Sequence, residues 1–168
     1  MTISTPKSAA TISRRSGLRQ AAAWKPARAK TFGKRRGASL GIEAADTPAL
    51  IREIEAGFSF DALQRLEAHS GLSLSQLACV VGIPERTLAR RKAAGRLSPE
   101  ESERLVRISY LVDKALELFE GDLEAAARWF TSPKKALDNQ QPIQYARTEL
   151  GAREVENLLG RLEYGVFS

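Results

Sequence analysis

The sequence has little of the chemistry that enzymes and metal sites need. Its 168 residues include one histidine, His69, and one cysteine, Cys79. A single cysteine excludes an intramolecular disulfide framework and suits a reducing compartment such as the cytoplasm. Cys79 lies among apolar neighbours, so we expect a buried thiol rather than a reactive one. Phosphate-binding glycine patterns and zinc-ligand spacings are also absent from the sequence, and we predict neither a metal nor a cofactor.

Long apolar runs are missing as well. No stretch approaches the roughly 18 residues of a membrane span, so we expect a cytoplasmic protein with no membrane partner. Carboxylates are scattered, and the cluster of Glu100, Glu101 and Glu103 stands at a predicted helix N-terminus, where capping and the helix dipole account for it. His69, near the end of a predicted helix, is typical of a surface or capping group. These residues predict no enzyme active site.

Acidic residues are absent from the first quarter of the chain. Residues 1–42 contain ten Lys or Arg and no Asp or Glu, whereas the remainder holds 16 basic and 20 acidic residues. The net charge of +6 therefore divides into +10 on this segment and −4 on the rest. Because the segment has few large apolar groups, it cannot bury enough surface to offset the entropy lost on ordering. We predict a disordered basic tail over residues 1–46.

Three roles for this tail stay open. The first is a solvated extension, which an upstream start codon would also produce. The second is an arm that holds DNA through non-specific, salt-dependent phosphate contacts. The third is a targeting peptide, because transit peptides are rich in Arg and poor in acids, although no apolar segment of about 7–15 residues follows for secretion.

From Leu74 to Ala94 the sequence LSQLACVVGIPERTLARRKAA predicts two short helices joined by a tight turn. Apolar residues recur at helical spacing along the first helix. Gly82 suits the left-handed residue at a helix C-terminus, Ile83 follows as a buried plug, and Pro84 suits the start of a second helix. This pattern is typical of a helix-turn-helix unit.

The second helix is basic on the face that would enter a DNA major groove. Predicted contacts with operator DNA are Arg86, Thr87, Arg90, Arg91 and Lys92. One alternative is an ordinary helical hairpin with solvated Arg side chains. For Arg91 a structural role is also open, because many helix-turn-helix units keep an apolar residue there. Its side chain would then pack against Glu101 or Glu103.

The remaining start and stop residues predict further helices and an all-α fold. Ser98, Pro99 and Glu101 form a capping box at the start of the longest helix, which extends to about Phe119. Apolar residues surround this helix nearly completely, so it must be covered on two sides. Flanking helices of the same chain or a second subunit would supply that cover.

The last third of the chain predicts short helices and an apolar end. Asp122 caps a helix in which Trp129 and Phe130 are adjacent, so one of them should point away from the core. Gly151 precedes the final helix, whose apolar positions recur at helical spacing. The chain then ends on large apolar residues around Gly165. Such groups at a chain end indicate an interface, unless they dock on the protein's own core.

Three irregular segments occur in order after the basic tail: RTLARRKAAGRLSPEESERLVRI, ALELFEGDLEAAARWFTSPKKAL and TELGAREVENLLGRLEYGVFS. They resemble the Xre/MbcA/ParS family of antitoxins over roughly residues 48–168. Family members carry glycines just after the leucine that matches Leu137, whereas this chain has Asp138 and Asn139. Both residues tolerate positive φ, so we expect the turn to be kept.

The resemblance implies a DNA-binding and dimerisation module over 47–119 and a toxin-binding domain over 120–168. It implies the antitoxin of a bacterial type II pair, a homodimer that represses its own operon. The partner would be a RES-domain toxin, a class that consumes NAD⁺, and the C-terminal part would occlude the toxin's active site. The toxin contacts predicted in this way are Leu137, Pro142, Tyr145, Arg161, Tyr164, Gly165, Val166, Phe167 and Ser168.

One alternative comes from a different class of protein. A stand-alone helix-turn-helix transcription regulator would have the same first module, and its C-terminal module would sense a ligand or dimerise. A toxin gene next to this one would separate the two interpretations.

Overall fold

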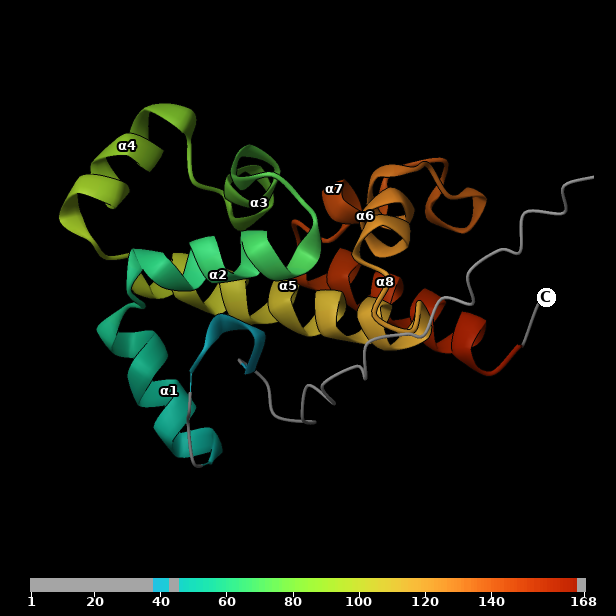
Figure 1. Cartoon of the computed structure of the whole chain (residues 1–168), viewed down its shortest axis with the longest axis horizontal. Helices are drawn as coiled ribbons and strands as arrows, with labels where there is room; N and C mark the ends of the chain where they lie inside the picture. Colours follow the sequence, from blue (N-terminus) through green and yellow to red (C-terminus); the bar gives the residue numbers. More distant parts are fainter. Residues whose placement is uncertain (1–37, 43–45, 166–168) are drawn as a thin grey trace, which may run out of the picture.

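The computed structural model describes residues 38–42 and 46–165 and shows helices joined by short turns, with no β-strand in that part of the chain (Figure 1). The predicted all-α fold is confirmed. The elements are η1 (Ala38–Leu40), α1 (Thr47–Ala56), α2 (Phe60–Ser70), α3 (Leu74–Val81), α4 (Glu85–Ala94), α5 (Pro99–Leu118), α6 (Leu123–Thr131), η2 (Lys135–Leu137), α7 (Pro142–Tyr145) and α8 (Glu149–Glu163). None of the described helices is long and apolar enough to cross a membrane.

Side-chain caps start several of the helices, among them the two helices whose caps the sequence predicts at Ser98 and Asp122. Ser59 and Asp122 cap α2 and α6, and Ser73 and Ser98 each form a full capping box at the start of α3 and α5. Such caps satisfy backbone N–H groups that a helix leaves unpaired at its first turn. Helix boundaries in this protein are therefore largely local properties of the sequence.

The 20-residue helix α5 is the axis of the molecule (Figure 1). Helices α1, α2 and α3 pack on it together with α6 and α8. Leu105 and Val112 share one face of α5, Val106 and Leu111 lie on either side of that face, and all four are at most 7 % exposed. The same chain thus covers α5 on both sides, and burial of this helix does not require a second subunit. The homodimer stays a prediction.

Order begins earlier in the chain than predicted. Leu40 in η1 is completely buried, and η1 packs against α2 and α5. Ser39 donates a hydrogen bond to Asp113 of α5 at 3.1 Å, and Arg65 of α2 donates to the carbonyl oxygen of Leu40 at 3.3 Å. The tail prediction is therefore wrong for residues 38–42, because an apolar pair, Leu40 and Ile42, ends the polar segment. Residues 1–37 and 43–45 lie outside the described residues.

Three smaller predictions are corrected. Cys79 is exposed because it lies on the outer face of α3, between the buried Ala78 and Val80. Trp129 and Phe130 are both buried, since Phe130 enters the core while Trp129 packs edge-on against it with ring centroids 5.1 Å apart. The cation of Lys134 covers the Trp129 ring at 5.5 Å.

The third correction concerns the start of the last helix. It begins at Glu149 with Thr148 as its cap, so Gly151 lies inside the first turn rather than before it. The apolar stripe that follows is placed as predicted, with Val155 and Leu159 at most 2 % exposed. Helix α8 is therefore anchored along its middle on α5.

Candidate functional site

The turn between α3 and α4 has the geometry of a helix-turn-helix unit. Gly82 has φ 82° and donates its N–H to the end of α3. The N–H of Ile83 donates to the carbonyl oxygen of Ala78 at 2.8 Å, and the Ile83 side chain is 3 % exposed. Pro84 is the N-cap residue of α4, so it lies just before the helix and not in its first turn. The predicted plug and left-handed turn are confirmed.

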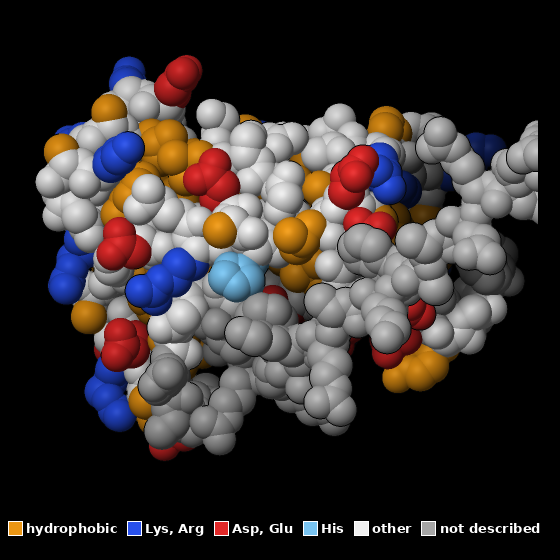
Figure 2. Space-filling model, viewed as in Figure 1, with side chains coloured by type: hydrophobic (Ala, Val, Ile, Leu, Met, Phe, Trp, Pro, Cys, Tyr) orange, Lys and Arg blue, Asp and Glu red, His pale blue; other side chains and the backbone are white. Residues whose placement is uncertain are grey.

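Helix α4 has an exposed basic face and an inner face whose side chains are only half-buried. Arg86, Arg90 and Lys92 are exposed, whereas Thr87 and Arg91 are half-buried. Figure 2 shows Lys and Arg side chains around the edge of the molecule that α4 occupies, with Asp and Glu side chains between them. Because residues three or four apart share a helix face, Arg86 and Arg90 point outward together, as major-groove contacts require.

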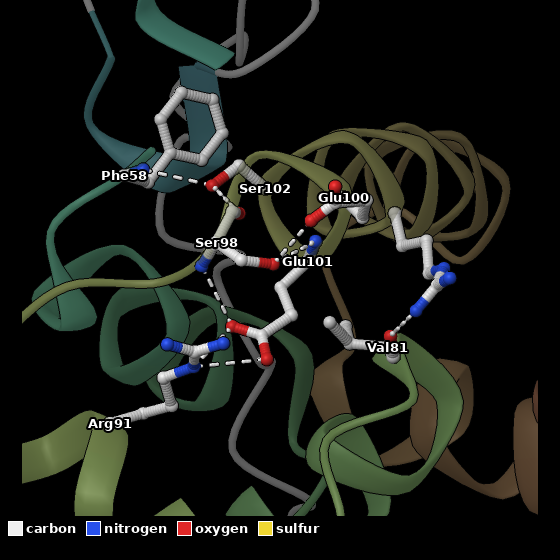
Figure 3. Close-up of polar contacts among 8 residues, drawn as sticks. Phe58, Val81, Arg91, Ser98, Glu100, Glu101 and Ser102 are labelled. Atoms are coloured by element: carbon white, nitrogen blue, oxygen red, sulfur yellow. Dashed lines mark hydrogen bonds and ion pairs between the residues drawn. The ribbon is translucent and has the colours of Figure 1, made fainter. Parts of the chain in front are cut away.

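Arg91 is placed differently from the other basic residues of α4. Its Nε donates to Glu101 Oε1 at 3.0 Å and lies 2.9 Å from Oε2 (Figure 3). The Glu101 side chain is only 9 % exposed, and that of Arg91 is 26 % exposed. This geometry supports the structural alternative for Arg91, and direct contact of its guanidinium with DNA stays a prediction. In this structure its guanidinium binds a carboxylate of α5.

A cluster of hydrogen bonds fixes the start of α5, on which Arg91 rests (Figure 3). Glu101 accepts from the Ser98 N–H at 2.8 Å, and its own N–H donates to Ser98 Oγ at 3.3 Å. Ser102 Oγ accepts from the Phe58 N–H at 2.9 Å and donates to the Ser98 carbonyl at 2.7 Å. The segment at Phe58, 44 residues before Ser102, is thus tied to the start of α5. Sequence reasoning found the capping box but not the contact between Ser102 and Phe58.

The two carboxylates at this helix end, Glu100 and Glu101, lie in different surroundings. Hydrogen bonds from its own backbone N–H and from Ser98 hold the pKa of the exposed Glu100 below its ordinary value. Glu101 next to it turns inward toward Arg91. The carboxylates of this cluster are therefore capping and ion-pairing groups, and within the described residues no group of three or more His, Cys, Asp or Glu could hold a metal ion.

The predicted toxin contacts fall into three sets in the structure. Leu137 and Pro142 are buried in the core, which means that their side chains support the fold and do not present a surface. Tyr145 is half-buried, while Arg161 and Tyr164 are exposed, Tyr164 to 78 %. Gly165 has φ 64° and turns the chain after α8. The other predicted contacts, Val166, Phe167 and Ser168, lie outside the described residues.

Two open grooves follow the exposed side of α8. One, of about 980 Å³, lies between the end of α3 and the segment from α7 to α8, and the other, of about 580 Å³, lies toward the end of α8. Glu154 and Asn157 line both grooves, so the two lie next to each other along α8. Leu150, at the edge of the first groove, is 77 % exposed. Sequence reasoning missed Leu150, although a single leucine among polar residues at a helix start could have indicated it.

The turn before α7 keeps its form without glycine. Asp138 and Asn139 have φ 54° and 55°, as expected from the tolerance of these residues for the left-handed region. The N–H of Lys134 donates to the Gln140 carbonyl at 3.0 Å and closes the loop. Asp138 and Asn139 therefore adopt the left-handed conformation that this turn requires.

Comparison with known proteins matches both halves of the chain. Residues 49–110 match the antitoxin Xre-like helix-turn-helix domain, and residues 114–165 match the antitoxin Xre/MbcA/ParS C-terminal toxin-binding domain. These two matches define the antitoxin of a type II toxin–antitoxin system, with a helix-turn-helix domain followed by a toxin-binding domain. They favour an antitoxin over a stand-alone regulator.

Individual relatives carry the same name. A protein named Antitoxin Xre from Yersinia enterocolitica is 39 % identical over 130 residues, which cover 77 % of this chain and 88 % of that protein. Another of that name, from Photorhabdus laumondii, is 30 % identical over 131 residues, with the same two shares. The chain therefore belongs to the Xre/MbcA/ParS family of antitoxins, which are not enzymes.

Proposed function

We propose that this antitoxin neutralises a RES-domain toxin of the NAD⁺-consuming class by covering its active site. We assign this covering role to the C-terminal end of the chain, because that end follows a helix, α8, that is anchored on the body of the protein. Val155 and Leu159 hold α8 on α5, whereas Tyr164 projects from the helix with 78 % of its surface exposed. An aromatic side chain on a rigid support binds with little loss of rotamer entropy.

The groove along α8 extends this proposed surface toward α7. Tyr145 and Leu150 line the first of the two grooves, and Arg161 and Tyr164 line the second. A toxin that receives the chain end would also contact these residues. We assign toxin binding to residues 120–168, with Leu137 and Pro142 acting through the fold and the remaining predicted residues acting directly.

The second part of the proposal is autorepression in the cytoplasm. Arg86 and Arg90 point away from the body of the protein, and Arg is the residue that most often reads guanine in the major groove. We assign DNA binding and dimerisation to residues 47–119. A homodimer would present two α4 helices to the two halves of an operator.

Growth rescue tests the proposal. Cells expressing the toxin encoded beside this gene should grow when the antitoxin is co-expressed. The Arg90→Ala variant should rescue growth equally well but bind the promoter more weakly by about 1–3 kcal/mol. Failure of the intact chain to rescue would contradict the assignment of a toxin partner, and unchanged promoter binding by the variant would contradict the role of α4.

A further inference from the structure

Helix α4 is held by few contacts. It contains no buried residue, and only Leu88 packs against the core from within it. Its two ends are fixed, because Ile83 before it and Leu97 after it are each 3 % exposed and the Gly95 carbonyl accepts from the Phe60 N–H at 2.9 Å. Fixed ends leave the rotation of the helix about its own axis to be set by its inner face.

The strongest polar contact on that inner face is the Arg91–Glu101 pair. Arg91 lies one turn from Thr87 and three residues from Leu88, turned inward by about 100° from the exposed Arg90. Both Glu101 oxygens lie within 3.0 Å of its Nε. A hydrogen-bonded ion pair of low exposure has a more fixed geometry than a surface pair, because water competes less for it.

The carboxylate itself cannot move freely. Glu101 accepts the Ser98 N–H in the capping box, and the same helix end is tied to Phe58 through Ser102. Figure 3 shows Arg91 reaching from α4 toward this fixed group. Arg91 thus connects a thinly packed helix to a rigid part of the molecule.

We propose that the Arg91–Glu101 pair positions α4 for DNA binding, by holding the helix in the rotation that points Arg86 and Arg90 into the major groove. Arg91 and Glu101 are positioning residues in this account and do not read bases. The proposal rests on the DNA-binding part of the proposed function. It makes an acidic residue, Glu101, a contributor to operator affinity.

The sign of one effect separates this role from a direct DNA contact. Removing a carboxylate near DNA strengthens binding by simple electrostatics, and it would also free Arg91 to reach a phosphate. Loss of a positioning contact weakens specific binding instead. Glu101→Gln is the suitable change, because glutamine still caps the Ser98 N–H but carries no charge for Arg91.

The experiment measures dissociation constants at one salt concentration for two duplexes of equal length, the protein's own promoter fragment and a random sequence. We expect Glu101→Gln to weaken promoter binding about tenfold and to leave random-sequence binding unchanged. Arg91→Ala should weaken promoter binding by a similar factor. The double variant should bind the promoter no more weakly than either single variant, because both changes break the same ion pair. Arg91→Lys should restore part of the affinity. Glu103→Gln, the same charge change at an exposed position of α5, serves as the control.

The dissociation constants of the variants test the positioning role of the Arg91–Glu101 pair. Promoter binding by Glu101→Gln that equals or exceeds that of the intact protein would overturn the positioning role, as would additive losses in the double variant. Equal toxin neutralisation by all variants would show that they remain folded. If the intact protein itself does not distinguish its promoter from the random duplex, the proposed repressor function fails, and this inference fails with it.

Discussion

Gly151 lies so close to the carbonyl oxygen of Tyr145 that a Cβ atom at position 151 would stand 1.9 Å from it. The close approach joins the last residue of α7 to the first turn of α8, where the Gly151 N–H also donates to Thr148 Oγ1 at 3.0 Å. Only a residue without a side chain lets the two helices close in this way. The glycine therefore fixes the shape of the toxin-binding domain rather than its chemistry.

Gly151→Ala should lower the free energy of unfolding by about 1–3 kcal/mol, because the methyl group forces backbone apart. Urea denaturation followed by circular dichroism measures this. Gly160→Ala in the same helix is the matched control, since nothing lies within 4 Å of its Cβ position. That change should stabilise the helix by about 0.5–1 kcal/mol. Equal changes in the free energy of unfolding for the two substitutions would contradict the close approach of Gly151 to the Tyr145 carbonyl oxygen.

Asp113 should make stability fall as pH rises. Burial raises the pKa of its carboxyl group to about 6, with Glu117 adding to the rise, while the hydrogen bond from Ser39 and the nearby His69 oppose it. No hydrogen-bond partner of Asp113 Oδ1 occurs among the described residues. A carboxyl group whose pKa is raised in the folded state binds its proton more tightly there. The free energy of unfolding therefore falls as the pH rises from about 4 to about 6, and above about pH 6 the cost of ionising Asp113 is fully present.

Asp113→Asn removes this titration and keeps an acceptor for Ser39. The variant should gain about 1–2 kcal/mol over the intact protein at pH 7 and show no such gain at pH 4, since solvent screening of this partly exposed carboxyl group reduces the full effect of its raised pKa. Urea denaturation at both pH values checks this, with Glu103→Gln as an exposed control on the same helix. A difference between variant and intact protein that does not change with pH would contradict the raised pKa.

Ser102→Ala should be costly, although it removes a single oxygen atom. Ser102 is completely buried and accepts the N–H of Phe58, which would then have no partner. An unsatisfied buried backbone group costs about 1–3 kcal/mol. Ser109→Ala is the matched control, because Ser109 is equally buried but bonds only the Val106 carbonyl of its own helix. Thermal unfolding should separate the two variants, and similar midpoints would argue against the role of Ser102.

The basic tail should add a sequence-independent term to DNA affinity. Deleting residues 2–37 removes all ten of its positive charges but keeps Ser39 and Leu40 docked. The slope of log affinity against log salt should become shallower by about 0.9 for each phosphate that the shortened protein no longer neutralises. Fluorescence anisotropy with the promoter fragment at several salt concentrations measures the slope. An unchanged slope would leave the tail as solvated chain.

Local sequence patterns predict most of the fold because most helix ends here are set by their own caps. Ser98 and Asp122 start helices where the pattern places them. What the pattern cannot predict depends on contacts across the chain. The docking of Leu40 on α2 and α5 joins segments far apart in sequence, and so does the hydrogen bond between Phe58 and Ser102.

The candidate site shows the same division. Helical spacing alone places Arg86 and Arg90 on an outer face, as the structure has them. Composition groups Arg91 with them, since charge alone does not distinguish a solvated guanidinium from one paired with Glu101. Leu137 is indicated only by resemblance, and the structure places its side chain in the core.

Occlusion of the toxin by the end of α8 is most directly tested by following NAD⁺ consumption by the purified RES-domain toxin. The measurement compares equimolar intact antitoxin with a variant that lacks residues 164–168. Because Tyr164 is 78 % exposed, the truncated protein should unfold at nearly the same urea concentration as the intact one. The intact protein should stop the loss of NAD⁺, whereas the folded truncation should not. Full inhibition by the truncation would contradict it and move the inhibitory contact toward Tyr145 and Leu150.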